Sequence, residues 1–264
     1  MYEGKLLRDK LISGHVCLGI FNSSSDPCIA ELLCGSGLDF MIIDAEHGAL
    51  IIETVQANIM AAKGSDTVPL VRVPSQDDVF IKRVLDAGAG GILVPQVRSV
   101  EEVQRAVSAC LYPPEGVRGV GPRRAFNYYR DLAKCISTAN ECVVVLAQIE
   151  NADAISAIEQ ICKVSRLDGV IPGPSDLSTS MGFPGQPQHP EVLAAIERMK
   201  IAAKNAGIAP GMAGSVNAET SIDWLAKGYQ FVTVGNNISL IANACDALVD
   251  CVRKSTGKAK GGLS

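Results

Sequence analysis

Apolar residues recur along the chain in short runs that are bounded by glycine, proline and polar residues. Runs of about four to eight apolar residues, rich in valine and isoleucine, are typical of strands that are buried on both faces, as in a parallel sheet. Eight such runs predict strands at residues 16–21, 40–44, 68–73, 91–95, 143–150, 169–173, 209–213 and 231–235.

Amphipathic segments alternate with these strands and predict helices at residues 27–35, 51–63, 78–87, 100–111, 152–164, 190–206, 218–227 and 239–254. Pro27 and Pro190 stand at first helical positions, and Gly88, Gly207 and Gly228 directly follow helix ends, as start and stop signals do. The alternation predicts an α/β protein, a (β/α)₈ TIM barrel, whose active site would lie at the C-terminal ends of the strands.

The length sets the domain organisation. With 264 residues and 47% hydrophobic content the chain can bury one large core, so residues 1–254 are expected to form a single barrel domain. The Gly- and Lys-rich tail, residues 255–264, is expected to be disordered. The gap between residues 95 and 143 is longer than one helix needs, and a loop of that size is usually functional.

Composition narrows the partners and the compartment. The net charge is −4, with no long run of either sign, so nucleic acid is not an expected partner. No segment has the roughly 20 apolar residues that cross a bilayer, and the N-terminus lacks a secretory signal, so no membrane partner and a cytoplasmic location are expected. The nine cysteines include no CxxC pair; most, Cys245 among them, lie in apolar or helical runs, which favours reduced, packed thiols.

Two carboxylates follow neighbouring strands. Glu150 ends the strand 143–150, and Asp176 follows the strand 169–173 across a Gly/Pro turn, one βα unit later. A buried strand end tolerates an ionised Glu only beside a cation, because desolvation costs several kcal/mol. Two carboxylates, waters and an oxygen-bearing substrate suit Mg²⁺ or Mn²⁺. The alternatives are helix caps or loop acids, and a carboxylate pair for acid/base catalysis.

Three further side chains carry possible chemistry. His47 follows the second strand between acidic neighbours and is a candidate general base, or else part of a loop-capping cluster. Arg72 ends the third strand and needs an anion, either an internal carboxylate or a substrate oxyanion. Asp86 ends its helix, where a negative charge opposes the helix dipole, so it serves another group or is simply exposed.

The turn that precedes Asp176 offers backbone N–H groups. Because Pro174 has no N–H, Ser175 and Asp176 would be the donors to a bound carboxylate. None of the eight predicted strands contains a lysine that could form a Schiff base. Activation of a carbonyl group is therefore expected to come from a metal ion.

These residues lie in segments that resemble the metal-dependent (class II) pyruvate aldolases of the HpcH/HpaI family. The likeness runs from about residue 18 to residue 248. The matching segments are residues 43–48, 69–74, 81–88, 93–95, 112–121, 148–150, 173–178 and 185–192.

The resemblance implies a barrel of the phosphoenolpyruvate/pyruvate-domain type and assigns its site. Glu150 and Asp176 would hold the divalent ion, Mg²⁺ or Mn²⁺ with Co²⁺ as a further option. Gln148 and Arg72 would contact bound pyruvate, and the backbone N–H groups of Ser175 and Asp176 would bind its carboxylate. The metal and Arg72 would stabilise the enolate that attacks an aldehyde.

The resemblance also implies the acid/base group and the assembly. His47, oriented by Asp86, would be the acid/base that acts on the hydroxyl of the substrate. The implied activity is reversible cleavage of a 4-hydroxy-2-oxo acid to pyruvate and an aldehyde. Members form hexamers, trimers of dimers, in which C-terminal helices are exchanged between subunits, and the apolar segment 238–252 could be exchanged in this way.

Two other functions remain as alternatives. An oxaloacetate decarboxylase or a macrophomate-synthase-like enzyme would pass through the same enolate. A catalytically idle barrel that acts as a binding or assembly module is disfavoured by the complete set of His47, Arg72, Glu150 and Asp176.

The chain departs from the family pattern in two places. The family commonly has an acidic residue two positions after the Gly235 position, where this chain has Asn237, so the charge at that rim is reduced. The loop after Gly121 is also shorter and differs in its aromatic residues. In that loop Arg123 and Tyr128 could bind a distal acid or hydroxyl, or lie at an interface. Both departures concern the aldehyde and leave the pyruvate end unchanged.

Overall fold

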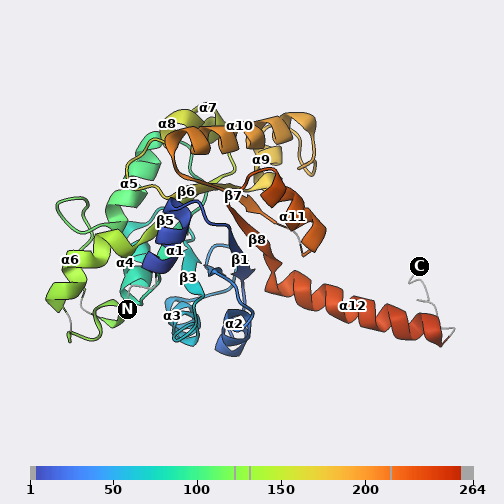
Figure 1. The fold of residues 1–264 in the computed structure, drawn as a ribbon, viewed down its shortest axis with the longest axis horizontal. Helices are drawn as coiled ribbons and strands as arrows, with labels where there is room; N and C mark the ends of the chain where they lie inside the picture. Colours follow the sequence, from blue (N-terminus) through green and yellow to red (C-terminus); the bar gives the residue numbers. More distant parts are fainter. Residues whose placement is uncertain (1–3, 122, 131, 215, 257–264) are drawn as a thin grey trace.

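Eight parallel strands close into a barrel in the order in which they occur along the chain (Figure 1). The computed structural model describes residues 4–121, 123–130, 132–214 and 216–256. The strands are β1 (Cys17–Asn22), β2 (Phe40–Asp44), β3 (Val68–Arg72), β4 (Gly91–Val94), β5 (Val144–Ile149), β6 (Gly169–Pro172), β7 (Ala209–Ala213) and β8 (Phe231–Asn236). The predicted (β/α)₈ barrel is confirmed, and no predicted strand end is displaced by more than one residue.

Helices surround this barrel, and most of them were predicted. These are α2 (Pro27–Cys34), α3 (Ile52–Ala61), α4 (Asp78–Asp86), α5 (Val100–Cys110), α10 (Pro190–Ala206), α11 (Ala218–Ala226) and α12 (Asn237–Ser255). Their starts follow local chemistry: the side chain of Asp77, for example, accepts a hydrogen bond from Val79 N at the start of α4. The helix predicted at 152–164 is divided into α7 (Ala152–Ser156) and α8 (Ile158–Ile161), because the backbone leaves the helical conformation at Ala157.

Four helical segments were not predicted: α1 (Gly4–Ile12), η1 (Arg124–Phe126), α6 (Leu132–Cys142) and α9 (Pro174–Ser180). The segments η1 and α6 occupy the long gap before β5. The helix α1 closes the N-terminal end of the barrel, where Leu7 and Leu11 join the apolar cluster inside it. The segments η1 and α9 are too short for a helical period to show, whereas α6 has the apolar spacing of a predicted helix but lies in the gap that was interpreted as a loop.

Large side chains fill the barrel at the N-terminal ends of its strands. The rings of Phe40 and Phe231 meet edge to face with centroids 6.1 Å apart, and both are almost completely buried. Gly19 and Gly211 lie where a Cβ atom would overlap these rings, so the two glycines make room for them. The barrel interior is therefore packed at this end, and a ligand cavity can form only toward the C-terminal ends of the strands.

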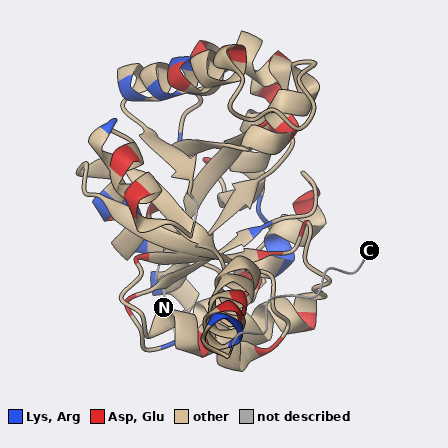
Figure 2. Ribbon diagram, turned by 90° about the vertical axis from the view of Figure 1, so that its right-hand side faces the viewer, with Lys and Arg blue, Asp and Glu red and all other residues tan. Residues whose placement is uncertain are grey.

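Charged residues of both signs are interspersed along the outer helices in the view of Figure 2. One exposed pair joins α10 to α8: Arg198 donates from Nε to Glu159 Oε1 and from Nη2 to Oε2, both at 2.8 Å. Nearly half of each side chain is exposed, so the pair contributes at most about 1 kcal/mol to stability. Neither residue lines the active-site cavity, so substitutions in this pair provide controls for substitutions in the site.

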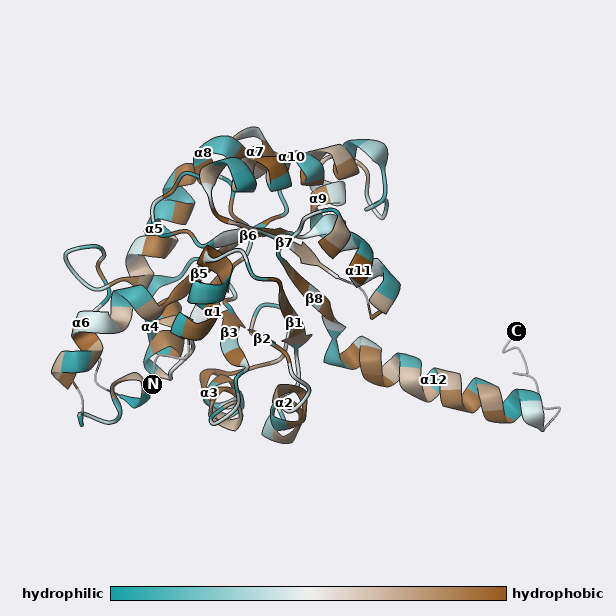
Figure 3. Ribbon diagram, in the orientation of Figure 1, coloured by the Kyte–Doolittle hydropathy of each residue, from teal (hydrophilic) through white to brown (hydrophobic). Residues whose placement is uncertain are grey.

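The helix α12 extends away from the barrel (Figure 1) and carries apolar residues along its length (Figure 3). Ile238, Ile241, Leu248 and Val252 all have more than half of their surface exposed. Cys245 is exposed on the same helix, so the prediction that it is packed was wrong for a single chain. No helix in the described part of the chain is long and apolar enough to cross a membrane.

The predicted disordered tail falls mostly outside the described residues. Of residues 255–264, the structure describes Ser255, which ends α12, and Thr256, which follows it.

Candidate active site

A cavity of about 550 Å³ lies at the C-terminal ends of the strands. Residues from β1, β2, β3, β5, β6, β7, β8 and the start of α12 line it. Arg72 and Gln148 lie on one side of this cavity, and Gly173 and Ser175 border it nearby. Polar residues that end several strands therefore meet at this face of the barrel.

A buried carboxylate holds the guanidinium of Arg72. Asp44 and Arg72 are opposite each other in the register of β2 and β3. Arg72 Nε donates to Asp44 Oδ1 at 2.9 Å and Nη2 donates to Oδ2 at 2.7 Å. Burial alone would raise the pKa of Asp44, but the hydrogen bonds and charge of Arg72 hold it below its ordinary value. The pair therefore fixes a rigid guanidinium at the cavity.

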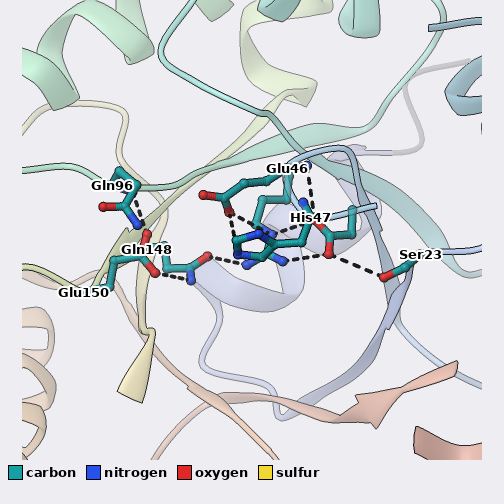
Figure 4. Close-up of polar contacts among 8 residues, drawn as sticks. Ser23, Glu46, His47, Gln96, Gln148 and Glu150 are labelled. Atoms are coloured by element: carbon teal, nitrogen blue, oxygen red, sulfur yellow. Dashed lines mark hydrogen bonds and ion pairs between the residues drawn. The ribbon is translucent and has the colours of Figure 1, made fainter. Parts of the chain in front are cut away.

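Gln148 connects Arg72 to Glu150 through hydrogen bonds, and its bond to Glu150 is drawn in Figure 4. Arg72 Nη1 lies 3.4 Å from Gln148 Oε1, and Gln148 Nε2 donates to Glu150 Oε2 at 2.5 Å. The other oxygen of Glu150 accepts from Gln96 N at 2.7 Å. Gln96 has a left-handed backbone with φ 55°, a strained conformation for a residue other than glycine. This backbone conformation directs the N–H of Gln96 toward the Glu150 carboxylate.

Three carboxylates influence one another at this side of the cavity. Glu150 is only 2% exposed; burial, with Glu46 and Asp176 nearby, raises its pKa to about 7. Burial also raises the pKa of Glu46, although Arg72 Nε lies 3.3 Å from its Oε2. That oxygen is buried and accepts no hydrogen bond within the described chain. The site therefore has more negative charge than Arg72 can balance.

This excess of charge fits a divalent cation. Glu150 and Asp176, the predicted ligands, belong to neighbouring strand ends, and their carboxylate oxygens are hard donors of the kind that Mg²⁺ and Mn²⁺ take. No group of three or more His, Cys, Asp or Glu side chains with metal-binding geometry occurs in the described ranges. A two-carboxylate site, completed by water and substrate, needs no such group.

His47 follows β2 close to these acids. Its side chain is 65% exposed, and Nε2 lies 3.8 Å from Glu46 Oε2. Its backbone N–H donates to Asp44 Oδ1 at 3.2 Å, so Asp44 positions the loop that carries the imidazole. His47 thus lies beside the carboxylates with its ring open to solvent, a position that suits a proton carrier.

Asp86 does not line this cavity. It ends α4, which leads from the C-terminal end of β3 back toward the N-terminal end of β4. Its Oδ1 accepts from Arg118 Nη2 at 2.8 Å, and it borders a separate cavity of about 600 Å³ together with Arg123 and Tyr128. Within the described part of one chain Asp86 makes no contact with His47, so the role predicted for Asp86 stays a prediction.

Ser175 and Asp176 stand in the first turn of α9, directly after the buried strand β6. Backbone N–H groups in a first helical turn have no acceptor within their helix. Asp176 influences the pKa of both Glu46 and Glu150. Ser175 lines the cavity together with Arg72 and Gln148, and Asp176 follows it in the same turn. The roles predicted for the two residues stay predictions.

Sequence reasoning missed Asp44 as a site residue, along with the contact of Glu46 with Arg72. The signal was present, because Asp44 and Arg72 are the last residues of two consecutive strands. Aligned strand ends bring such residues together in a parallel sheet. Of the two partners expected for Arg72, the internal carboxylate is present. Nη1 of the guanidinium points toward Gln148, which also lines the cavity.

We expect divalent-ion affinity to depend on pH. Because the pKa of Glu150 is raised to about 7, a proton competes with the metal below that pH. The affinity for Mn²⁺ should rise about tenfold per pH unit up to pH ~7 and then level off, since one proton is displaced. Calorimetry from pH 5.5 to 8.5 in two buffers of different ionisation enthalpy would measure this. A flat profile would contradict it.

Gly173 is in contact with the Glu150 carboxylate, and its replacement by alanine should weaken metal binding. A Cβ atom at Gly173 would overlap Glu150 Oε2 and lie 2.9 Å from Gln148 Nε2. Displacement of this carboxylate should raise the Kd for Mn²⁺ roughly 10- to 100-fold. Gly119→Ala is the matched control, because the nearest atom to its Cβ would be Lys82 Cδ at 3.8 Å. Equal Mn²⁺ affinity in the two variants would refute the prediction.

The fold and this cavity define an enzyme of the parallel barrel class, whose active site lies at the C-terminal ends of its strands beside the ion pair of Asp44 and Arg72. The HpcH/HpaI aldolase/citrate lyase model matches residues 18–244. The chain belongs to the HpcH/HpaI aldolase/citrate lyase family. It is therefore a lyase of the aldolase type, and it acts on small molecules.

Known proteins similar to this chain agree with the assignment. It is 40% identical over 243 residues to a 4-hydroxy-2-oxo-heptane-1,7-dioate aldolase of Salmonella typhimurium, covering 91% of this chain and 92% of the relative. An HpcH/HpaI family protein from Burkholderia cenocepacia has a TM-score of 0.88, with 30% identity, over 94% of this chain and 98% of that one. The citrate synthase SbnG has a TM-score of 0.85, with 33% identity, over 96% and 99%.

Proposed function

We propose that the chain is a divalent-metal-dependent aldolase that reversibly cleaves a 4-hydroxy-2-oxo acid to pyruvate and an aldehyde. The observation that carries this proposal is the link, through Gln148, between the buried carboxylate of Glu150 and a guanidinium held by Asp44. A cation at Glu150 and Asp176 would be Mg²⁺ or Mn²⁺, with Co²⁺ as a further option. When bound, it would supply a Lewis acid to the oxygens of the 2-oxo acid.

The residues of the chain would bind and orient pyruvate. Its carboxylate would accept hydrogen bonds from the N–H groups of Ser175 and Asp176 in the first turn of α9. Its keto oxygen would face Arg72 Nη1 and Gln148, which are already fixed by their own hydrogen bonds. Donors that are positioned before the reaction stabilise developing charge without a cost of reorganisation.

His47 is the proposed proton carrier. In the cleavage direction, a base takes the proton of the 4-hydroxyl, the bond between C3 and C4 breaks, and the electron pair passes into the enolate of pyruvate. Arg72 would balance the charge on the enolate oxygen, and a proton then adds to C3 to give the methyl group of pyruvate. The imidazole beside Glu46 is open to solvent and can return its proton there.

We also propose that copies of the chain assemble through α12. The exposed apolar residues of this helix would be covered if it packs against a second copy. A hexamer, built as a trimer of dimers with exchanged C-terminal helices, is the expected assembly. Size-exclusion chromatography with light scattering measures the mass of the assembly, and Leu248→Lys should give smaller species.

Exchange of pyruvate methyl protons with D₂O tests the proposed function without any aldehyde. Chelator-treated protein should exchange them slowly, and added Mg²⁺ or Mn²⁺ should restore fast exchange, measured by proton NMR. Trapping of pyruvate on the protein by borohydride would reveal an imine and overturn the proposal. Metal-independent exchange would do so as well.

A further inference from the structure

The end of the cavity away from Glu150 is lined by uncharged residues. It is built from the ends of β7 and β8 and from the first residues of α12. Its lining includes Ala213, Gly214, Thr233, Asn236, Ile238 and Ser239. Two of the wall positions, Ala213 and Gly214, are small. This end can therefore accept the carbon chain of an aldehyde beside bound pyruvate.

The polar groups at this end are neutral. Thr233 is almost completely buried; its Oγ1 accepts from Gly214 N at 3.1 Å, which leaves its O–H as a donor. The side-chain oxygen of Asn236 accepts from Ser239 N at 2.8 Å and so caps α12. Asn237 Oδ1 accepts from Ser23 N at 3.0 Å, so this uncharged amide takes part in a structural bond. These groups match hydroxyl and carbonyl oxygens rather than a full charge.

The charges of the site also disfavour a second carboxylate on the substrate. Among the described residues that line the cavity, Arg72 alone carries a full positive charge, and Asp44 already occupies two of its donors. Glu46, Glu150 and Asp176 add negative charge, of which two units would be balanced by a divalent cation. A second carboxylate on the substrate, at the far end, would lack a partner there. Bringing like charges together in a partly buried site disfavours binding.

From these observations we infer that the aldehyde substrate of this chain is uncharged, in contrast to a semialdehyde that carries a distal carboxylate. The inference rests on the proposed aldolase function and adds the class of the second substrate. Ile238 would contact its carbon chain, and Thr233 and Ser239 would face a neutral polar group on it.

The test compares aldehydes of similar shape and different charge. The metal-loaded enzyme is given pyruvate with 4-oxobutanoate, with its methyl ester, or with pentanal, and kcat/KM is measured for each addition. The ester and pentanal should exceed 4-oxobutanoate by at least about tenfold, chiefly through KM. A value for 4-oxobutanoate equal to or above those of the neutral aldehydes would overturn the inference.

A variant moves the preference in a set direction. Ile238→Arg places a guanidinium at the cavity and should shift the ratio toward 4-oxobutanoate by at least about tenfold. Ile222→Arg adds the same charge to an exposed position on α11 and should leave the ratio unchanged. If wild type prefers 4-oxobutanoate and Arg123→Ala loses that preference, the inference fails and Arg123 supplies the cation.

Proton exchange distinguishes a wrong inference about the aldehyde from a wrong proposed function. If pyruvate protons exchange in a metal-dependent way while 4-oxobutanoate is preferred, only the inference about the aldehyde is wrong. If no metal-dependent exchange occurs, the proposed function itself is wrong.

Discussion

Glu150→Gln should abolish metal-dependent activity while making the metal-free protein more stable. The amide cannot supply the negative oxygen that the cation needs, and loss of a Lewis acid removes several kcal/mol of transition-state stabilisation. We expect kcat to fall roughly a thousandfold or more, and Mn²⁺ binding to be lost. Pyruvate proton exchange and calorimetry measure the two effects.

The stability effect follows from the raised pKa of Glu150. This pKa is about 7 in the folded protein against an ordinary value of 4.5 for a glutamate, so the folded state binds the proton more tightly. Stability of the metal-free protein should therefore fall as the pH rises from ~4.5 to ~7, by an amount on the order of 3 kcal/mol. Glutamine carries no charge and escapes this loss, so its Tm at pH 8 should be higher by roughly 5 °C.

The control for this effect is Glu159→Gln on the exposed pair with Arg198, which should change Tm by less than ~2 °C. The difference between wild type and Glu150→Gln should shrink below pH ~4.5, where both side chains are neutral. Saturating Mn²⁺ should reverse the order at pH 8, because only wild type binds it. Equal Tm values for the metal-free proteins at pH 8 would contradict the predicted cost of the buried charge.

Arg72→Lys should lower the rate of pyruvate proton exchange about 10²- to 10³-fold with the fold retained. Lysine keeps the charge but cannot donate two bonds to Asp44 and still present a fixed N–H toward Gln148. Charge at the enolate oxygen would then meet a mobile ammonium group. NMR exchange rates at saturating pyruvate isolate this effect from binding.

Arg198→Lys is the matched control, because Arg198 also makes two bonds to one carboxylate but does so at the surface. Its exchange rate should stay within about twofold of wild type. A loss of less than tenfold for Arg72→Lys would show that charge alone suffices at this position, and that the guanidinium geometry is not used.

The barrel could be predicted because its signals are local. Each strand is a short apolar run between turn residues, and each main helix has its own start or stop signal, such as Asp77 for α4. Two of the segments that were missed have weak local signals: α1 is stabilised by Leu7 and Leu11 inside the barrel, and α9 begins in the turn after β6. Their stability comes from contacts with distant residues, which periodicity does not record.

The candidate site divides in the same way. Glu150, Asp176, His47 and Arg72 could be predicted because each follows an apolar strand where a polar residue needs a partner. The partner itself could not be chosen, and Arg72 proved to be bound by Asp44. The choice depends on register, which only the closed sheet defines.

The amino-acid order by itself determined that this chain alternates strands with helices and places acids at strand ends, because these are properties of neighbouring residues and their desolvation. The tertiary structure alone decided the environment of each acid. It buried Glu150 beside Glu46 and Asp176 and so raised its pKa to about 7, and it surrounded Asp86 with the arginines of another loop. A side chain's charge state and partner depend on residues far away in the sequence, and these meet only when the barrel closes.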